Sequence, residues 1–166
     1  MAKELDQQDP RVLHPDHHPT PFTAAEIRDA SGPGRTVRRL IEVEGEAPVT
    51  RVMQWVDVDD EGATGLAYGV GPGGEQLDPT TWRSKWLELQ HHASMPIETT
   101  TIDEVVLDSP MGPLDCLRYT SLDGDAVDVF WFARAMPGMP VNTERIEHGK
   151  VVERVTMTAN EIPEAP

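Results

Sequence analysis

Histidine is the residue type in this chain best suited to metal binding and proton transfer, and most of its copies fall into two short groups. The first group, His14, His17 and His18, lies beside Asp16 in a proline-rich segment near the N-terminus. Imidazole and carboxylate groups are ligands for transition metals. A structural metal site needs fixed ligand geometry, which a proline-broken segment does not provide. We therefore expect this segment to hold no metal.

The second group, His91 and His92, falls at the end of a predicted helix. Adjacent residues on a helix point about 100° apart, so the two rings do not share one metal-binding face. A histidine near a helix C-terminus interacts favourably with the helix dipole, which is the simplest explanation for this pair. The alternative is that one imidazole enters a pocket as an acid or base, with Asp115 or Glu88 orienting it.

Two further motifs have simple structural explanations. Residues 57–62, DVDDEG, resemble the start of a calcium-binding loop, but Tyr68 occupies the position of the required twelfth-residue acid, and strand patterns flank the motif. We interpret it as a β-turn. Cys116 lies in an apolar-alternating segment, where a small buried hydrophobic residue is its expected role. The sequence contains no phosphate loop or zinc-binding spacing, so we expect no cofactor.

Charge and composition limit the classes of partner. The 166 residues include 29 acidic and 14 basic side chains, which give a net charge of −15. This charge disfavours nucleic acids and anionic membranes as partners, because both are repelled at long range. A single cysteine excludes an intrachain disulfide and favours a reducing compartment. The N-terminal residues have no signal-peptide pattern and no apolar run could span a membrane, so we expect a cytoplasmic protein.

The first half of the chain predicts one helix followed by three strands. Thr23 and Glu26 form a capping-box pattern that begins a helix ending near Ala30. Glycine and proline at residues 31–34 stop this helix. Apolar-alternating segments separated by polar turns then predict strands over residues 36–44, 49–58 and 63–70.

A second helix is predicted in the middle of the chain. Asp78 followed by Pro79 is the pattern of an N-cap and a first helical residue. The next residues place Trp82, Trp86 and Leu89 at the spacing of one helical face. Two tryptophans on one face are large enough to dock this helix firmly on a sheet.

The last third of the chain predicts a continuous antiparallel meander. A strand over residues 97–108 leads into four apolar-alternating segments between Leu114 and Asn160, which are separated by short polar turns. The chain is therefore expected to form an α+β fold. About eight mainly antiparallel strands would carry one N-terminal and one mid-chain helix. We expect residues 1–22 to be a flexible arm, residues 23–160 a single domain and residues 161–166 a tail.

One strand of the meander, residues 127–133, is apolar on both faces. Phe130 and Phe132 lie on one face and Trp131 on the other, so both faces of this strand should be covered. Core filling explains this pattern, and a cavity for an apolar ligand between a curved sheet and a helix is the alternative. The large aromatic residues expected to shape this core or pocket are Trp55, Trp82, Trp86, Phe130, Trp131 and Phe132.

The sequence resembles half-barrel proteins similar to the lipoprotein-localisation factor. The motifs are a Pro-x-Gly turn at Pro110, an aromatic strand over residues 129–132 and a Pro-Gly-x-Pro-Val segment over residues 137–141. The early Pro-Gly-Arg-Thr-Val segment, residues 33–37, is compatible with the same pattern. The element order matches from Thr23 to Asn160, and the motifs fall between Ser109 and Asn160. The resemblance implies a curved, half-barrel-like sheet wrapped over helices, with an apolar cavity.

These observations lead to one functional expectation and two alternatives. We expect a non-catalytic domain that binds an apolar or amphipathic small molecule, or a peptide, between sheet and helix. One alternative is an enzyme that uses His91 or His92 as an acid or base in the same cavity. The other is a protein-interaction module that uses an exposed sheet edge. The sequence leaves the oligomeric state open.

Overall fold

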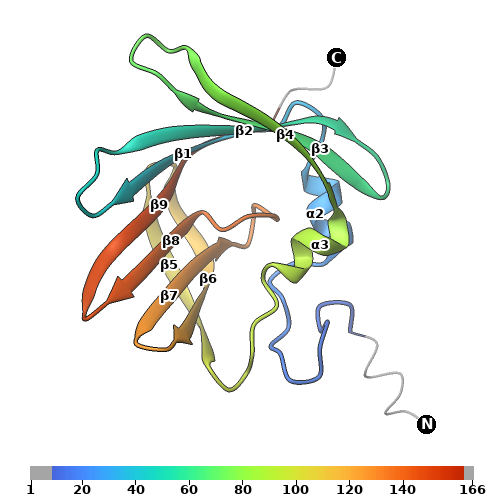
Figure 1. Ribbon diagram of the computed structural model, residues 1–166. Coiled ribbons are helices and arrows are strands. Elements are labelled where there is room, and N and C mark those ends of the chain that lie inside the picture. Colours follow the sequence, from blue (N-terminus) through green and yellow to red (C-terminus); the bar gives the residue numbers. More distant parts are fainter. Residues whose placement is uncertain (1–8, 163–166) are drawn as a thin grey trace.

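The computed structural model describes residues 9–162, and its strands form one nine-stranded sheet (Figure 1). In chain order the elements are α2 (Ala24–Ala30), β1 (Thr36–Val43), β2 (Val49–Val58), β3 (Gly62–Val70), β4 (Gln76–Lys85), α3 (Trp86–His91), β5 (Thr100–Ser109), β6 (Gly112–Asp123), β7 (Ala126–Ala133), β8 (Asn142–Glu147) and β9 (Lys150–Glu161). The spatial order is β4-β3-β2-β1-β9-β8-β7-β6-β5, and all neighbouring strands are antiparallel. The predicted α+β class is confirmed.

The sheet is strongly curved, and the helices lie at the open side of its concave face, which is called the hollow below (Figure 1). Strands β1 to β4 arch over one part of the hollow, and β5 to β9 enclose the other part. The loop between β7 and β8, residues 134–141, extends into this hollow toward α2 and α3. None of the helices that the structure describes is long and apolar enough to cross a membrane.

Local sequence explains the last hairpin of the meander. The β8–β9 connection is the two-residue turn His148–Gly149, and both residues have positive φ angles, 52° and 76°. Turns of this kind match the twist of the flanking strands, and they favour glycine because positive φ is strained for most other residues. Along β7, Phe130 and Phe132 share the face toward the hollow while Trp131 occupies the opposite position, as strand alternation requires.

The prediction of a helix beginning at Pro79 is wrong for its first half. Residues 76–85 form the edge strand β4, and the helix α3 is only Trp86–His91. Strand β4 pairs with β3, where Trp82 lies opposite Gly65. The register shifts between Ala67 and Gly69, and Asp78 adopts a φ of 48° opposite this irregularity. The Thr-Thr-Trp segment favours a strand, and an edge strand tolerates proline. The sheet therefore has nine strands instead of about eight.

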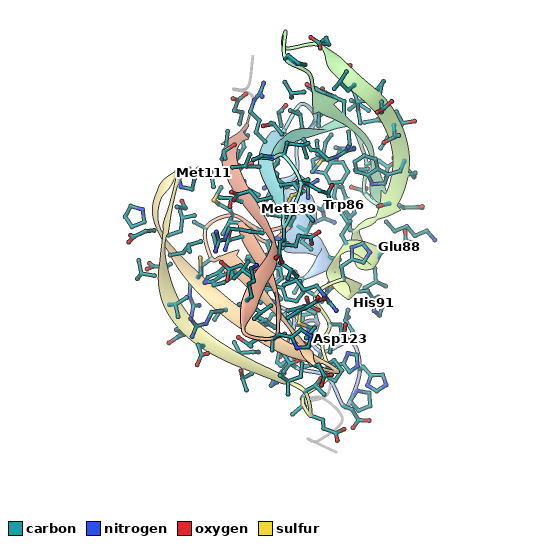
Figure 2. The ribbon with its side chains drawn as sticks, turned by 60° about the vertical axis from the view of Figure 1, so that its left-hand side comes forward. Trp86, Glu88, His91, Met111, Asp123 and Met139 are labelled. Atoms are coloured by element: carbon teal, nitrogen blue, oxygen red, sulfur yellow. The ribbon has the colours of Figure 1, made fainter. Side chains whose placement is uncertain are left out.

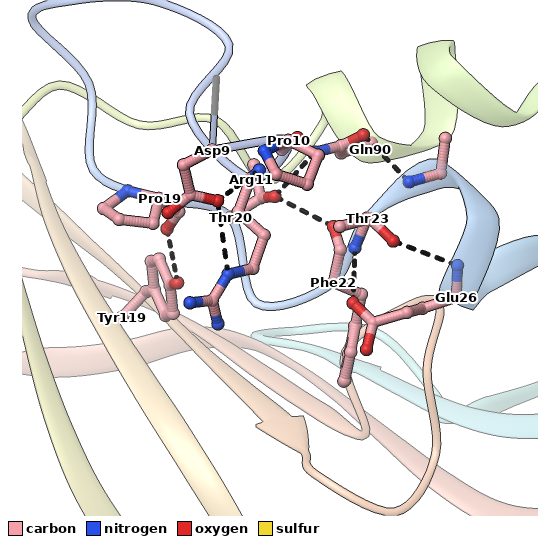
Figure 3. A network of polar contacts seen from close by, with 11 residues as sticks. Asp9, Pro10, Arg11, Pro19, Thr20, Phe22, Thr23, Glu26, Gln90 and Tyr119 are labelled. Carbon is pink, nitrogen blue, oxygen red and sulfur yellow. Dashed lines mark hydrogen bonds and ion pairs between the residues drawn. The ribbon is translucent and has the colours of Figure 1, made fainter. Parts of the chain in front are cut away.

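Residues 9–22, the described part of the predicted flexible arm, lie against the helices and the sheet (Figure 3). Thr20 is 1% exposed and donates its hydroxyl hydrogen bond to the Phe22 carbonyl. Gln90 of α3 donates to the Pro10 carbonyl and to Thr20, and it accepts from the backbone of the first residue of α2. Residues 1–8 and 163–166 of the predicted arm and tail lie outside the described residues, and the division into domains stays a prediction.

The predicted capping box of α2 is confirmed. The Glu26 backbone N–H donates to the Thr23 hydroxyl, and the Glu26 carboxylate accepts from the Thr23 backbone N–H. Phe22 and Ile27, which flank this cap, are 6% and 5% exposed and belong to the core. The cap therefore fixes the direction in which the chain leaves the N-terminal segment and enters α2.

Tyr119 anchors the N-terminal segment to the sheet. Its hydroxyl donates a 2.8 Å hydrogen bond to the Pro19 carbonyl, and burial raises the pKa of Tyr119 to about 12. An unfolded chain ionises tyrosine near pH 10. The neutral phenol is therefore favoured in the fold, and its stabilisation is complete below pH 10 and is lost as the pH rises through 12.

We expect Tyr119→Phe to lower the free energy of unfolding by about 1 kcal/mol at neutral pH, because the Pro19 carbonyl loses its donor. The decline in stability between about pH 10 and 12 should also become shallower, because phenylalanine does not ionise. Chemical denaturation across this pH range measures both effects. The half-buried Tyr68 provides the control, and a Tyr68→Phe variant that flattened the alkaline decline as much would contradict this role of Tyr119.

Candidate functional site

A cavity of about 470 Å³ lies on the concave side of the sheet, under the two helices. Its walls come from α2 and α3, from β1 to β4, from β7 and from the loop over residues 134–141. Most lining side chains are apolar, among them Ile27, Leu89 and Met139. Figure 2 shows Met139 and Trp86 toward the interior of the molecule. Small-molecule sites are commonly apolar cavities of this size with a few polar groups.

Two aromatic clusters border the cavity. On the β2–β4 side, the ring of Trp55 lies 6.0 Å from that of Trp82 and 6.1 Å from that of Trp86. On the β6–β7 side, Phe132 lies 5.3 Å from Tyr119 and 6.5 Å from Phe130. Residues of both clusters line the same cavity.

Four of the six predicted aromatic residues line the cavity, namely Trp55, Trp82, Phe130 and Phe132. Trp86 is buried beside them, at 3% exposure, and its indole N–H donates to the Asp59 carbonyl. Trp131 does not line the cavity, since it faces the other side of β7. The geometry thus brings four of these residues to one cavity, and their role in binding a ligand stays a prediction.

Arg35 joins the elements that close one part of the cavity. This side chain is 3% exposed and lines the cavity. Its guanidinium donates to the Asn160 side-chain oxygen, to the Ser31 hydroxyl and to the carbonyls of Ala30 and Pro137. It therefore ties the end of α2 and the β7–β8 loop to β9. Burial lowers the pKa of Arg35 below the usual arginine value.

Arg39 is the second arginine on the cavity wall. Arg35, Val37 and Arg39 follow one another at alternate positions of β1 and its start, so they share the face toward the hollow. Arg39 interrupts the otherwise apolar face of β1 in the sequence. This interruption is the one signal that could have identified Arg39 as a site residue in advance.

The two histidines of α3 differ in position. His92 lines the cavity while remaining exposed, whereas His91 is exposed and does not line it. Glu88 and His91 lie on the outer side of α3 (Figure 2). Neither of the predicted orienting acids, Glu88 and Asp115, lines the cavity, and no other carboxylate of the described residues does. The paired acid and base of the enzyme alternative are therefore not brought together in residues 9–162.

The N-terminal histidines make structural contacts. The His17 ring is 2.8 Å from the Ser94 hydroxyl, and the His18 ring donates to the Thr100 carbonyl at 2.7 Å. The rings of His14 and His17 lie 4.5 Å apart. Among the described residues, no group of three histidine, cysteine or acidic side chains is arranged to hold a metal ion. These contacts hold the N-terminal segment against the chain that follows α3.

The other two motifs lie outside the cavity. In the predicted β-turn, Asp59 accepts from the backbone N–H groups of Glu61 and Gly62, and Arg83 pairs with the same carboxylate. The Arg83 hydrogen bond, followed by these backbone donors, lowers the pKa of Asp59. Cys116 is 1% exposed in the core, and burial raises the pKa of its thiol. A buried thiol of raised pKa is poorly suited to nucleophilic chemistry.

Comparisons with known proteins bear on the fold. No protein-family model matches this sequence, and no curated protein matches it. The chain is similar to solved structures of MucB. One of these is MucB in complex with MucA(peri), with a TM-score of 0.57 and 14% identity over 86% of this chain. MucB alone gives a TM-score of 0.59 and 13% identity over 86% of this chain.

The likeness to MucB is one of fold. The chain spans only 57% and 58% of the two MucB chains that it matches. At this level of identity the match supports the predicted sheet-rich, half-barrel-like architecture and carries no residue roles. The narrower resemblance to the lipoprotein-localisation factor stays a prediction.

We expect Arg35→Met to lower the free energy of unfolding by about 2–4 kcal/mol, because four buried or part-buried acceptors lose their donor. Arg38→Met is the matched control, since the neighbouring Arg38 is exposed on the outer face of β1. It removes the same charge from the acidic protein and should change stability by no more than about 0.5 kcal/mol. Urea denaturation measures both values. Equal losses from the two variants would show that net charge, and not the Arg35 contacts, accounts for the effect.

Proposed function

We propose that this chain is a non-catalytic binding domain that holds an apolar or amphipathic small molecule between its sheet and its helices. The observation that carries this proposal is the cavity of about 470 Å³ under α2 and α3. Its walls are mainly apolar and aromatic. The transfer of apolar groups from water into such a cavity lowers the free energy of the system.

The construction of the cavity supports binding over catalysis. Aromatic rings border it on two sides, and its polar lining consists of arginine, serine and one exposed histidine, without a carboxylate from residues 9–162. Acid–base catalysis generally uses titratable groups within hydrogen-bond reach of each other or of the substrate. An apolar cavity with few polar groups instead orients a bound molecule and does no chemistry on it. The resemblance to the lipoprotein-localisation factor agrees with a hydrophobic ligand.

A protein or peptide partner is the second candidate function. One of the similar solved structures is MucB in complex with MucA(peri), so a domain of this fold occurs in a protein complex. In this chain, β4 and β5 are the two edges of the open sheet. Leu77 and Val106 on these strands are 42% and 66% exposed. An open edge accepts a further strand by backbone hydrogen bonds.

A cytoplasmic location of the protein is a further part of this proposal.

The small-molecule proposal is tested by titrating the protein with dodecanol below its aggregation limit and following tryptophan fluorescence. Trp55 and Trp82 line the cavity, so occupancy should change their emission saturably and raise the melting temperature, as ligand binding to the folded state requires. The absence of both changes would contradict the proposal. A peptide partner would leave the dodecanol titration flat.

Ala67→Phe should weaken dodecanol binding by roughly ten-fold or more, because the ring would occupy space that the ligand needs. Ala67 is 7% exposed and lines the cavity. Leu66→Phe is the matched control, because the neighbouring residue of β3 faces the opposite side of the sheet. Equal affinities of the two variants would place the bound dodecanol outside the cavity.

A further inference from the structure

The arginines of this chain divide into two groups. Seven of them form ion pairs with acidic side chains, namely Arg11, Arg28, Arg83, Arg118, Arg134, Arg145 and Arg154. The remaining four have no carboxylate partner among residues 9–162, and all four lie on β1, on β2 or directly before β1. They are Arg35, Arg38, Arg39 and Arg51. In a chain with 29 acidic residues, unpaired arginines gathered in one place require an explanation.

Arg39 has the least compensated charge of these four. Its Nε is buried and has no hydrogen-bond partner within the described residues. Arg35, by contrast, has four acceptors, and Arg38 is exposed to solvent. Arg118 also has a buried Nε without a partner, but its guanidinium pairs with Asp103. Arg39 therefore combines a position on the cavity wall with an unsatisfied donor.

A second cation lies directly opposite. Arg39 and Arg51 are cross-strand partners in the β1–β2 pair, so both side chains project from the same face of the sheet. Burial, and then the charge of Arg51, lower the pKa of Arg39. Like charges at directly opposite positions destabilise a sheet, and a buried donor without an acceptor destabilises the fold as well. An acidic side chain at this place would remove both penalties, yet no described carboxylate reaches it.

We propose that the missing counter-charge is the anionic head group of the bound molecule, so that the cavity takes a single-chain amphiphile whose acidic oxygens contact Arg39. This inference rests on the proposed function and assigns its ligand class. The apolar chain would lie between Trp55, Phe130 and Met139, which line the same cavity as Arg39. The guanidinium then donates to a carboxylate or phosphate head, the two groups that its planar fork matches.

The overall charge favours an amphiphile over a free anion. A net charge of −15 repels small anions from the protein as a whole. Binding therefore needs a further contribution, which burial of an alkyl chain in the cavity provides. The same charge attracts a cationic head group and does not repel a neutral one, but either would leave the buried charge of Arg39 without a counter-charge.

The test compares ligands that share one alkyl chain and differ in the head group. Dodecanol, laurate and dodecyl phosphate are titrated below their aggregation limits and measured by calorimetry. A charge-assisted hydrogen bond contributes about 1.5–3 kcal/mol, so laurate or dodecyl phosphate should bind roughly ten-fold tighter than dodecanol, or more. The stronger of the two anions identifies the head group as a carboxylate or a phosphate.

Arg39→Met should abolish the preference of laurate and dodecyl phosphate over dodecanol, because methionine keeps an apolar wall without the charge. Arg38→Met, which removes an exposed arginine from the outer face of the same strand, should retain the preference. Arg39→Gln is the second variant in case Arg39→Met does not fold, and it too should lose the preference.

The outcomes separate the two proposals. If dodecanol binds and the anions bind no tighter, or if the preference survives in both Arg39 variants, the head-group assignment is wrong and the cavity proposal stands. If none of the three ligands binds, the binding function itself is contradicted and the head-group assignment falls with it. If Arg38→Met removes the preference as fully as Arg39→Met, the effect is one of net charge and the contact with Arg39 is excluded.

Discussion

The curved sheet has one largely apolar concave face, which must be shielded from water by other segments of the chain. Within residues 9–162 no second sheet covers that face, so helices and loops must do so. The two helices have only seven and six residues, which is short for a nine-stranded sheet. Residues 9–22 and the β7–β8 loop provide the remaining cover. The cavity is the part of the concave side that these four short pieces leave unfilled.

Short covering segments need polar anchors, because their backbone groups are not satisfied by regular secondary structure. Gln90, Tyr119 and Arg35 supply these anchors. Each of them joins segments that are far apart in the sequence. Elements held by a few such contacts open at a lower free energy than the strands of a sheet. We therefore expect the helical side, and not the sheet, to be the route by which a ligand enters.

The sequence predicts the parts of this fold that are encoded locally. The meander, its short polar turns and the capping box at Thr23 are local patterns, and the structure contains all of them. Strand β4 is the failure, because Asp78 and Pro79 match a helix start as well as an irregular edge strand. Pairing with β3 favours the strand over the helix, because Gly65 of β3 leaves room for the Trp82 ring. No local pattern carries that information.

The candidate site is predictable only in part, for the same reason. Large aromatic residues can be recognised in the sequence as candidates for the core or a pocket, and four of the predicted six line the cavity. Trp131 does not reach the cavity, since it lies on the opposite face of β7. When a strand is apolar on both faces, its sequence does not indicate which face lines the cavity. Arg35 is held in position by four partners. Two of them lie at the end of α2, one on β9 and one in the β7–β8 loop. Such a constellation exists only once the chain has folded.

The proposed function requires an apolar cavity between the two aromatic clusters that is able to hold a ligand. A crystal structure under xenon pressure tests this directly, because xenon enters dry apolar cavities. We expect xenon between the rings of Trp55 and Trp82 on one side and those of Phe130 and Phe132 on the other. Absence of xenon there, with side chains packed across the space, would contradict it.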